Sequence, residues 1–109
     1  YDVLSAYPVL GEGPSRMSPH RVKLAMAVRS RNAHWKVRDI LRRHWVALGT
    51  RHGVVSEDGR QVEFLIDDVV DRTPMVISAV RAVLPDGFPE SVAESILTGL
   101  QVAAHRLAV

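Results

Sequence analysis

The acidic residue Asp2 lies between Tyr1 and Val3, at the start of a mainly apolar run. An unpaired carboxylate is costly to bury in such surroundings, so a cation is expected close to it. The same side chain also serves in proteins as a helix cap or as an acceptor for a buried backbone N–H group. The hydroxyls of Ser5 and Tyr7 have no base near them in the sequence, and we expect them to form local hydrogen bonds and packing contacts.

Five histidines raise the question of a metal site. No two of them have the i, i+4 spacing on a helix that a zinc site of the HExxH type requires. The sequence contains no cysteine, which excludes a thiolate metal site and a disulfide framework. His44 lies in the predicted short helix, beside Arg43 and Trp45. The histidines are His20, His34, His44, His52 and His105.

Charge is divided between the two halves of the chain, although the net charge is only +2. Residues 21–51 contain nine Lys or Arg residues and one acid, Asp39, whereas residues 57–94 contain nine acids and three arginines. The basic half has two open interpretations: a surface that faces phosphates, or a solvated hairpin and helix face. Reading of a specific DNA sequence by this chain alone is not expected. The candidate contacts are Arg29, Arg31, Lys36, Arg38, Arg42, Arg43 and Arg51, with His34 and Trp35 among them.

The elements that carry the basic residues are predicted from periodicity. Alternating residue types favour a small antiparallel hairpin that pairs residues 23–29 with residues 34–38. Apolar residues then recur every three or four positions, at Leu41, Trp45 and Leu48, which predicts a helix over residues 40–52. Gly53 is placed as a helix-terminating C′ residue.

The acidic half predicts two long amphipathic helices. One apolar stripe covers residues 62–84, and because an interior proline costs about 3 kcal/mol, Pro74 predicts a kink or break near residues 71–73. A second helix begins at Pro89, and Gly99 and Ala104 would allow close approach of a partner helix. Two such helices joined by a short turn should pack antiparallel. The predicted faces are Val62, Leu65, Ile66, Val69, Thr73, Val76, Ile77, Val80, Val83 and Leu84, and then Val92, Ile96, Leu100, Ala103 and Leu107.

These elements predict a mainly α fold, a single helical domain over residues 1–109. It combines two long antiparallel helices, a shorter helix and a small N-terminal β-hairpin. With 47% apolar residues the chain is able to form a core, and no secretory signal or run of about 20 apolar residues is visible. We therefore expect a cytoplasmic protein without a membrane anchor. Because the sequence begins with tyrosine, we expect an excised fragment of a longer protein.

Four motifs in register suggest a family. The string Y-D-V-L-S-A-Y-P-V-L-G at residues 1–11 resembles a segment in the C-lobe of HipA-family serine/threonine kinases, the toxins of bacterial toxin–antitoxin pairs. Three further stretches resemble the family in order and spacing, so the resemblance covers roughly residues 1–107. They are Lys23-Leu24-Ala25-Met26, Arg43-His44-Trp45 and Leu84-Pro85-Asp86-Gly87-Phe88-Pro89-Glu90.

The resemblance implies a role for Asp2 and a set of partners. In the intact kinase Asp2 would bind the magnesium ion that bridges the ATP phosphates, and the phosphate would pass to Ser or Thr of a protein of the translation machinery. The family's catalytic loop and nucleotide-binding loop lie N-terminal to this motif, so the isolated fragment is expected to be inactive and to bind no cofactor. The implied partners are a HipB-like antitoxin and operator DNA.

Two alternatives accompany the kinase interpretation. The first is a non-enzymatic binding module whose basic half contacts DNA or an antitoxin. The second is a purely structural helical domain. A separate expectation concerns assembly, since apolar residues at the start of the chain would lose their cover in a fragment, and exposed apolar patches tend to associate. A fragment homodimer through a surface that includes Val3, Leu4 and Val9 is therefore possible.

Overall fold

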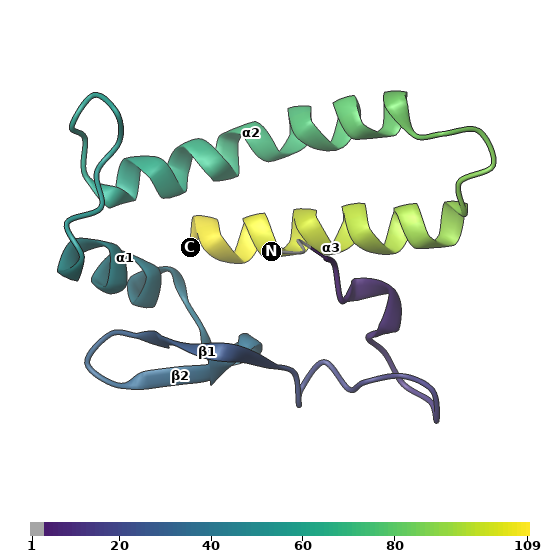
Figure 1. Cartoon of the computed structure of the whole chain (residues 1–109), viewed down its shortest axis with the longest axis horizontal. Coiled ribbons are helices and arrows are strands. Elements are labelled where there is room, and N and C mark those ends of the chain that lie inside the picture. The colour runs from purple at the N-terminus through teal and green to yellow at the C-terminus, as the bar shows by residue number, and fades with distance from the viewer. Residues whose placement is uncertain (1–3) are drawn as a thin grey trace.

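A computed structural model describes residues 4–109 of the chain, and within them the fold is mainly helical (Figure 1). The mainly α class with a small hairpin is confirmed. In chain order the elements are a 3-10 helix η1 (Tyr7–Val9), strands β1 (Lys23–Arg29) and β2 (Ala33–Lys36), a 3-10 helix η2 (Val37–Asp39), and helices α1 (Arg42–Arg51), α2 (Val62–Val83) and α3 (Glu90–Ala108).

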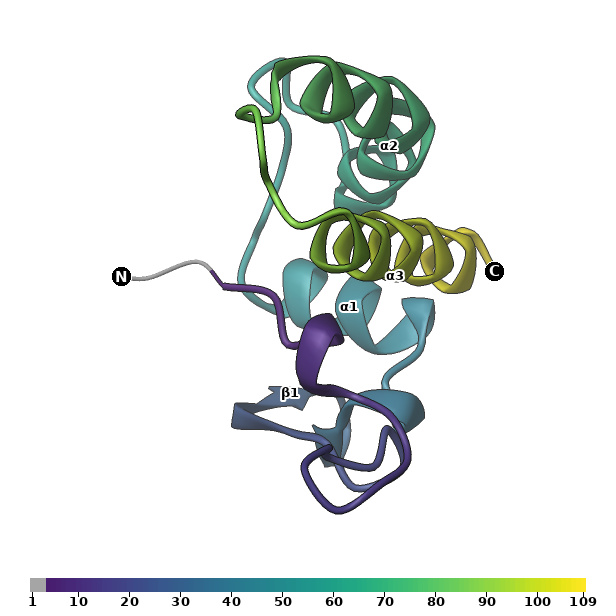
Figure 2. The same cartoon turned by 90° about the vertical axis from the view of Figure 1, so that its right-hand side faces the viewer.

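The elements are stacked on one another. Helices α2 and α3 lie side by side and antiparallel, connected by the turn at residues 84–89, as the sequence predicts (Figure 1). Figure 2 shows α2 on the outside, α3 next to it, α1 and η1 on the other side of α3, and the hairpin beyond α1. Helix α3 therefore lies at the centre and contacts α2, α1 and η1.

The predicted hairpin and short helix are both present. The strands pair antiparallel, with Lys23 opposite Lys36 and Val28 opposite His34, and an irregularity between these pairs. Strand β2 ends at Lys36, two residues earlier than predicted, because the chain turns into η2. Helix α1 begins two residues later and ends one residue earlier than the predicted range 40–52. Gly53, predicted as its C′ residue, has a φ of 65°, in the left-handed region that glycine tolerates best.

The loop between α1 and α2 is held by its own polar side chains. Residues 56–59 form a turn, with the Gly59 backbone at a φ of 81°. Ser56 Oγ accepts a hydrogen bond from the Arg60 N–H at 2.8 Å and donates one to the Asp58 carboxylate. Hydrogen bonds from Arg60 and Ser56 hold the pKa of Asp58 down at about 2. This local network fixes the direction in which the chain enters α2.

Of the kink or break predicted near residues 71–73, the break is wrong, because α2 continues through Pro74 for all 22 residues. Pro74 lacks an N–H group, but its ring is exposed, so it leaves the packing face intact. Neighbouring hydroxyls add hydrogen bonds to the backbone around it: Thr73 Oγ1 donates to the Val69 carbonyl at 2.7 Å, and Ser78 Oγ donates to the Pro74 carbonyl at 3.1 Å. Apolar contacts with α3 on both sides of the proline offset its cost.

Fewer residues of the two long helices are buried than predicted. In α3 the buried residues also lie on a different side of the helix from the predicted ones. In α2 only part of the predicted apolar face is buried. Val62, Ile66, Thr73 and Ile77 are buried, whereas Val69, Val76, Val80 and Val83 are exposed. In α3 the predicted Leu100 is exposed, Val92, Ile96, Ala103 and Leu107 are half-buried, and the buried residues are Ala93, Leu97 and Gly99. The difference arises because α3 is apolar around much of its circumference and has neighbours on two sides.

Candidate functional site

The segment that carries the N-terminal motif is seated on the middle of α3. The ring of Tyr7 in η1 lies directly against Gly99, at the place that a Cβ atom on residue 99 would occupy. The predicted close approach at Gly99 therefore exists, but its partner is an aromatic ring and not a helix. Asp2, the predicted magnesium ligand, lies outside the described residues, and the half-buried Tyr7 is the residue of its segment that contacts α3.

The hydroxyl residues of this segment have local contacts. The Tyr7 N–H donates to Ser5 Oγ at 3.4 Å, which agrees with the local role predicted for Ser5. Leu4 and Val9 of the surface considered for a homodimer are both exposed, whereas Val3 lies outside the described residues. The segment is thus fixed by Tyr7 on one side and presents apolar side chains to solvent on the other.

Two arginines connect the C-terminal end of α3 to the middle of the chain. Arg106 near the end of α3 donates from Nη2 to the carbonyls of Val37, Arg38 and Ile40, at 3.2, 3.0 and 3.4 Å. Arg42 pairs with Asp67 of α2 at 2.7 Å and donates to the Leu107 carbonyl at 3.2 Å. Arg42 was predicted as a phosphate contact, and its guanidinium is engaged within the fold. The role of Arg106 was missed, since only the folded chain brings it to η2.

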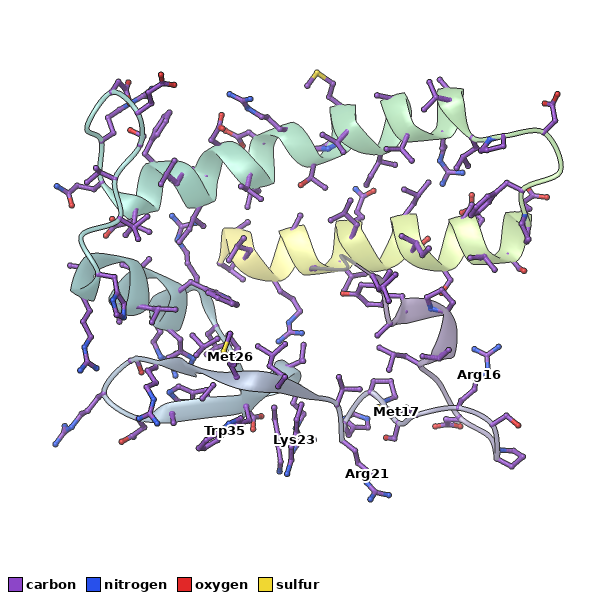
Figure 3. The ribbon with its side chains drawn as sticks, in the orientation of Figure 1. Arg16, Met17, Arg21, Lys23, Met26 and Trp35 are labelled. Atoms are coloured by element: carbon purple, nitrogen blue, oxygen red, sulfur yellow. The ribbon has the colours of Figure 1, made fainter. Side chains whose placement is uncertain are left out.

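The other candidate contacts lie on the surface. Arg29 and Arg31 stand at the tip of the hairpin, Lys36 ends β2, and Arg43 and Arg51 lie on α1; all are exposed. Arg38 is also exposed and pairs with Asp39 at 3.3 Å. Together they form a basic surface over the hairpin and α1. Figure 3 shows that Arg21, Lys23 and Trp35 project from the side of the hairpin that faces away from the helices.

A stacked histidine pair joins the hairpin to α1. The rings of His34 and His44 are nearly parallel, with centroids 3.8 Å apart. His44 is only 6% exposed, and its Nδ1 accepts the Leu41 N–H at 3.1 Å, which caps the first turn of α1. His34 Nε2 lies 3.1 Å from Ser30 Oγ. Burial, followed by the nearby His34 and Arg43, lowers the pKa of His44, so the neutral ring is favoured.

This lowered pKa predicts acid sensitivity near neutrality. The unfolded chain takes up a proton on His44 at about pH 6.5, before the folded chain does, so stability is fully present above that pH and falls below it. His44→Gln keeps an acceptor for the Leu41 N–H but cannot titrate. We expect the melting temperature of this variant to fall less than that of the parent between pH 7 and pH 5. His105→Gln, at an exposed position, should retain the parental dependence, and an unchanged dependence in His44→Gln would contradict the assignment.

An open cavity of about 860 Å³ lies between α1, α2, β1 and the end of α3. Its walls are mainly apolar and include Leu24, Trp45, Leu48, Leu65, Val69 and Leu107. Arg42 and Arg106 border it, but both are engaged in the contacts described above. The cavity is therefore an apolar recess in the scaffold and not a polar catalytic cleft.

Among residues 4–109, no three His, Asp or Glu side chains are gathered closely enough to hold a metal ion. Within the same residues, each helix is too short or too polar to cross a membrane. Comparison of the sequence with protein-family models and with curated proteins found no match.

Proposed function

We propose that the chain is the helical C-terminal part of a HipA-like serine/threonine kinase, in which it supports the segment that carries the magnesium ligand Asp2. The order of elements, a short N-terminal segment, a hairpin and then helices, agrees with the helical C-lobe that the resemblance implies. The observation that carries the proposal is the contact between Tyr7 and Gly99. It anchors the motif segment five residues from Asp2 on the central helix, as a metal-binding segment of a kinase requires.

The isolated chain should not transfer phosphate. One carboxylate without a second ligand and without a nucleotide-binding loop binds magnesium weakly. We expect no labelled protein product when the purified chain is incubated with magnesium, γ-labelled ATP and a bacterial translation extract. Phosphate transfer that the chain itself catalyses would overturn the assignment of the missing catalytic parts.

The proposal itself is tested by translating the gene upstream of the Tyr1 codon. A HipA-like kinase should have, roughly twenty residues before Asp2, a loop with an aspartate followed five positions later by an asparagine. An upstream sequence that lacks this pair would remove the kinase proposal. The binding function described next would then be the leading one.

The second candidate function is binding of duplex DNA through the basic surface. It is favoured by the exposure of Arg29, Arg31, Lys36, Arg43 and Arg51 on adjacent elements. We expect the logarithm of the binding constant to fall linearly with the logarithm of the salt concentration, by about 0.9 for each phosphate contacted. Arg43→Glu with Arg51→Glu should make this slope shallower by about 2. Absence of binding at low salt would exclude the duplex as a ligand.

A further inference from the structure

The outer edge of β1 has no strand beside it in the part of the chain that the structure describes. The sheet consists of β1 and β2 alone, so one edge of β1 presents backbone N–H and C=O groups that the ladder leaves unpaired. The first four residues of the strand, Lys23 to Met26, are all exposed, and Met26 is 83% exposed. An exposed edge that is both apolar and unpaired is a template for another strand.

The charges around this edge have one sign. Lys23 stands directly opposite Lys36 on β2, and like charges at paired positions destabilise a sheet. Arg21 precedes the strand, and Figure 3 shows it on the same side of the hairpin as Lys23. Neither lysine is within ion-pair distance of an acid in the described residues. The surroundings of the edge are therefore suited to carboxylates from outside.

We infer that the edge of β1 binds an extended peptide segment of a partner protein, which adds as a third strand and carries acidic residues beside Arg21 and Lys23 and apolar residues beside Leu24 and Met26. The inference assigns a ligand to one part of the basic surface, the edge of β1, and it names one class of partner. It does not depend on the kinase proposal. Main-chain hydrogen bonds would supply affinity, and the side chains would set direction.

Other occupants fit less well. In a second copy, antiparallel pairing of two β1 strands over their full length would place Lys23 opposite Arg29 of the other strand, and in-register parallel pairing would place each base opposite itself. The strand contains no acid to offset these charges. A nucleic acid would contact cations only at the start of the edge, because the next residues, Leu24, Ala25 and Met26, are apolar. It also has no peptide backbone that could form strand hydrogen bonds with β1. A lipid surface would leave the free N–H and C=O groups unsatisfied.

The experiment uses the whole chain labelled with ¹⁵N and two synthetic peptides, EVEVTVTV and KVKVTVTV. We expect the acidic peptide to shift the amide signals of residues 23–27 and to bind at least tenfold more tightly than the basic one. The double variant Arg21→Glu with Lys23→Glu should reverse this preference. The matched control is Arg43→Glu with Arg51→Glu, which changes charge equally on α1 and should retain the parental preference. Circular dichroism of each variant checks that the fold is intact.

Backbone pairing is tested separately from charge. Two forms of the acidic peptide are N-methylated at alternate residues, one on the odd and one on the even positions. Strand addition predicts that one form loses binding at least tenfold while the other retains it, since only one set of N–H groups faces β1. Equal effects of the two forms, equal affinity for both peptides, or signal shifts confined to α1 would overturn the inference. A DNA duplex that shifts the same amides while neither peptide binds would also overturn it, and would support the second candidate function instead.

Discussion

Leu97→Ala is expected to lower the free energy of unfolding by about 3 kcal/mol, the middle of the range for a buried leucine. Leu97 is 5% exposed and lies in the middle of α3, which contacts α2, α1 and η1. Removal of its methyl groups would leave a cavity that these neighbours cannot all move to fill. Because a domain of this size has a total stability of about 5–15 kcal/mol, the loss should be evident in urea unfolding followed by Trp fluorescence.

Leu100→Ala is the matched control, because it makes the same substitution one turn away in the same helix. Leu100 is 37% exposed, so its truncation should cost less than about 1 kcal/mol. The pair also tests the orientation of α3, since the sequence predicted Leu100 for the core and did not include Leu97. Equal costs for the two variants, or a greater cost for Leu100→Ala, would show that α3 is rotated from the orientation described here.

The rotation of α3 could not be read from its sequence for a physical reason. Periodicity identifies a face only when one side of a helix is apolar and the other polar. In α3 alanine, leucine, isoleucine and valine occur around much of the helix, and it packs against neighbours on two sides. The hairpin was easier to predict because alternation fixes which residues share a face. The end of α1 was predicted to within one residue because Gly53 has a specific conformational role.

Contacts between distant residues were beyond prediction from the sequence. Arg106 meets the carbonyls of η2 across almost seventy residues, and nothing in its local sequence distinguishes it from a surface arginine in the last turn of a helix. Arg42 was grouped with the phosphate contacts because it belongs to a basic stretch, whereas its partners are Asp67 of α2 and the Leu107 carbonyl near the end of α3. Composition identifies a charged surface but does not indicate which charges the fold uses internally.

The candidate magnesium site remains a prediction from the motif. Asp2 precedes the described residues. The structure shows only that the segment after it contacts α3, through the ring of Tyr7 against Gly99. The glycine was noticed in the sequence as a point of close approach, but its partner was expected to be a helix. A tyrosine partner could not be predicted, because the two residues are separated by most of the chain and share no periodic pattern.

Gly99→Ala is expected to displace Tyr7 from α3, because the new methyl group would occupy the position of the ring. Overpacking of this kind costs about 1–3 kcal/mol, whereas alanine in a helix interior gains about 1 kcal/mol over glycine. We expect a net loss of stability, together with faster amide exchange in residues 7–10. Thr98→Ala, at the exposed neighbouring position, is the control for substitution in this turn and should leave the exchange of η1 unchanged.

The sign of the effect should reverse when the ring is absent. In a Tyr7→Ala background the ring atoms nearest to the new methyl group are gone. The gain in helix propensity should then dominate, and the second substitution should stabilise the chain by about 1 kcal/mol. Urea unfolding of the parent, both single variants and the double variant gives the coupling energy between the two positions. A loss of similar size in both backgrounds would mean that Gly99 is needed for a reason other than Tyr7. The contact between Tyr7 and Gly99 would then not be what holds the N-terminal segment against α3.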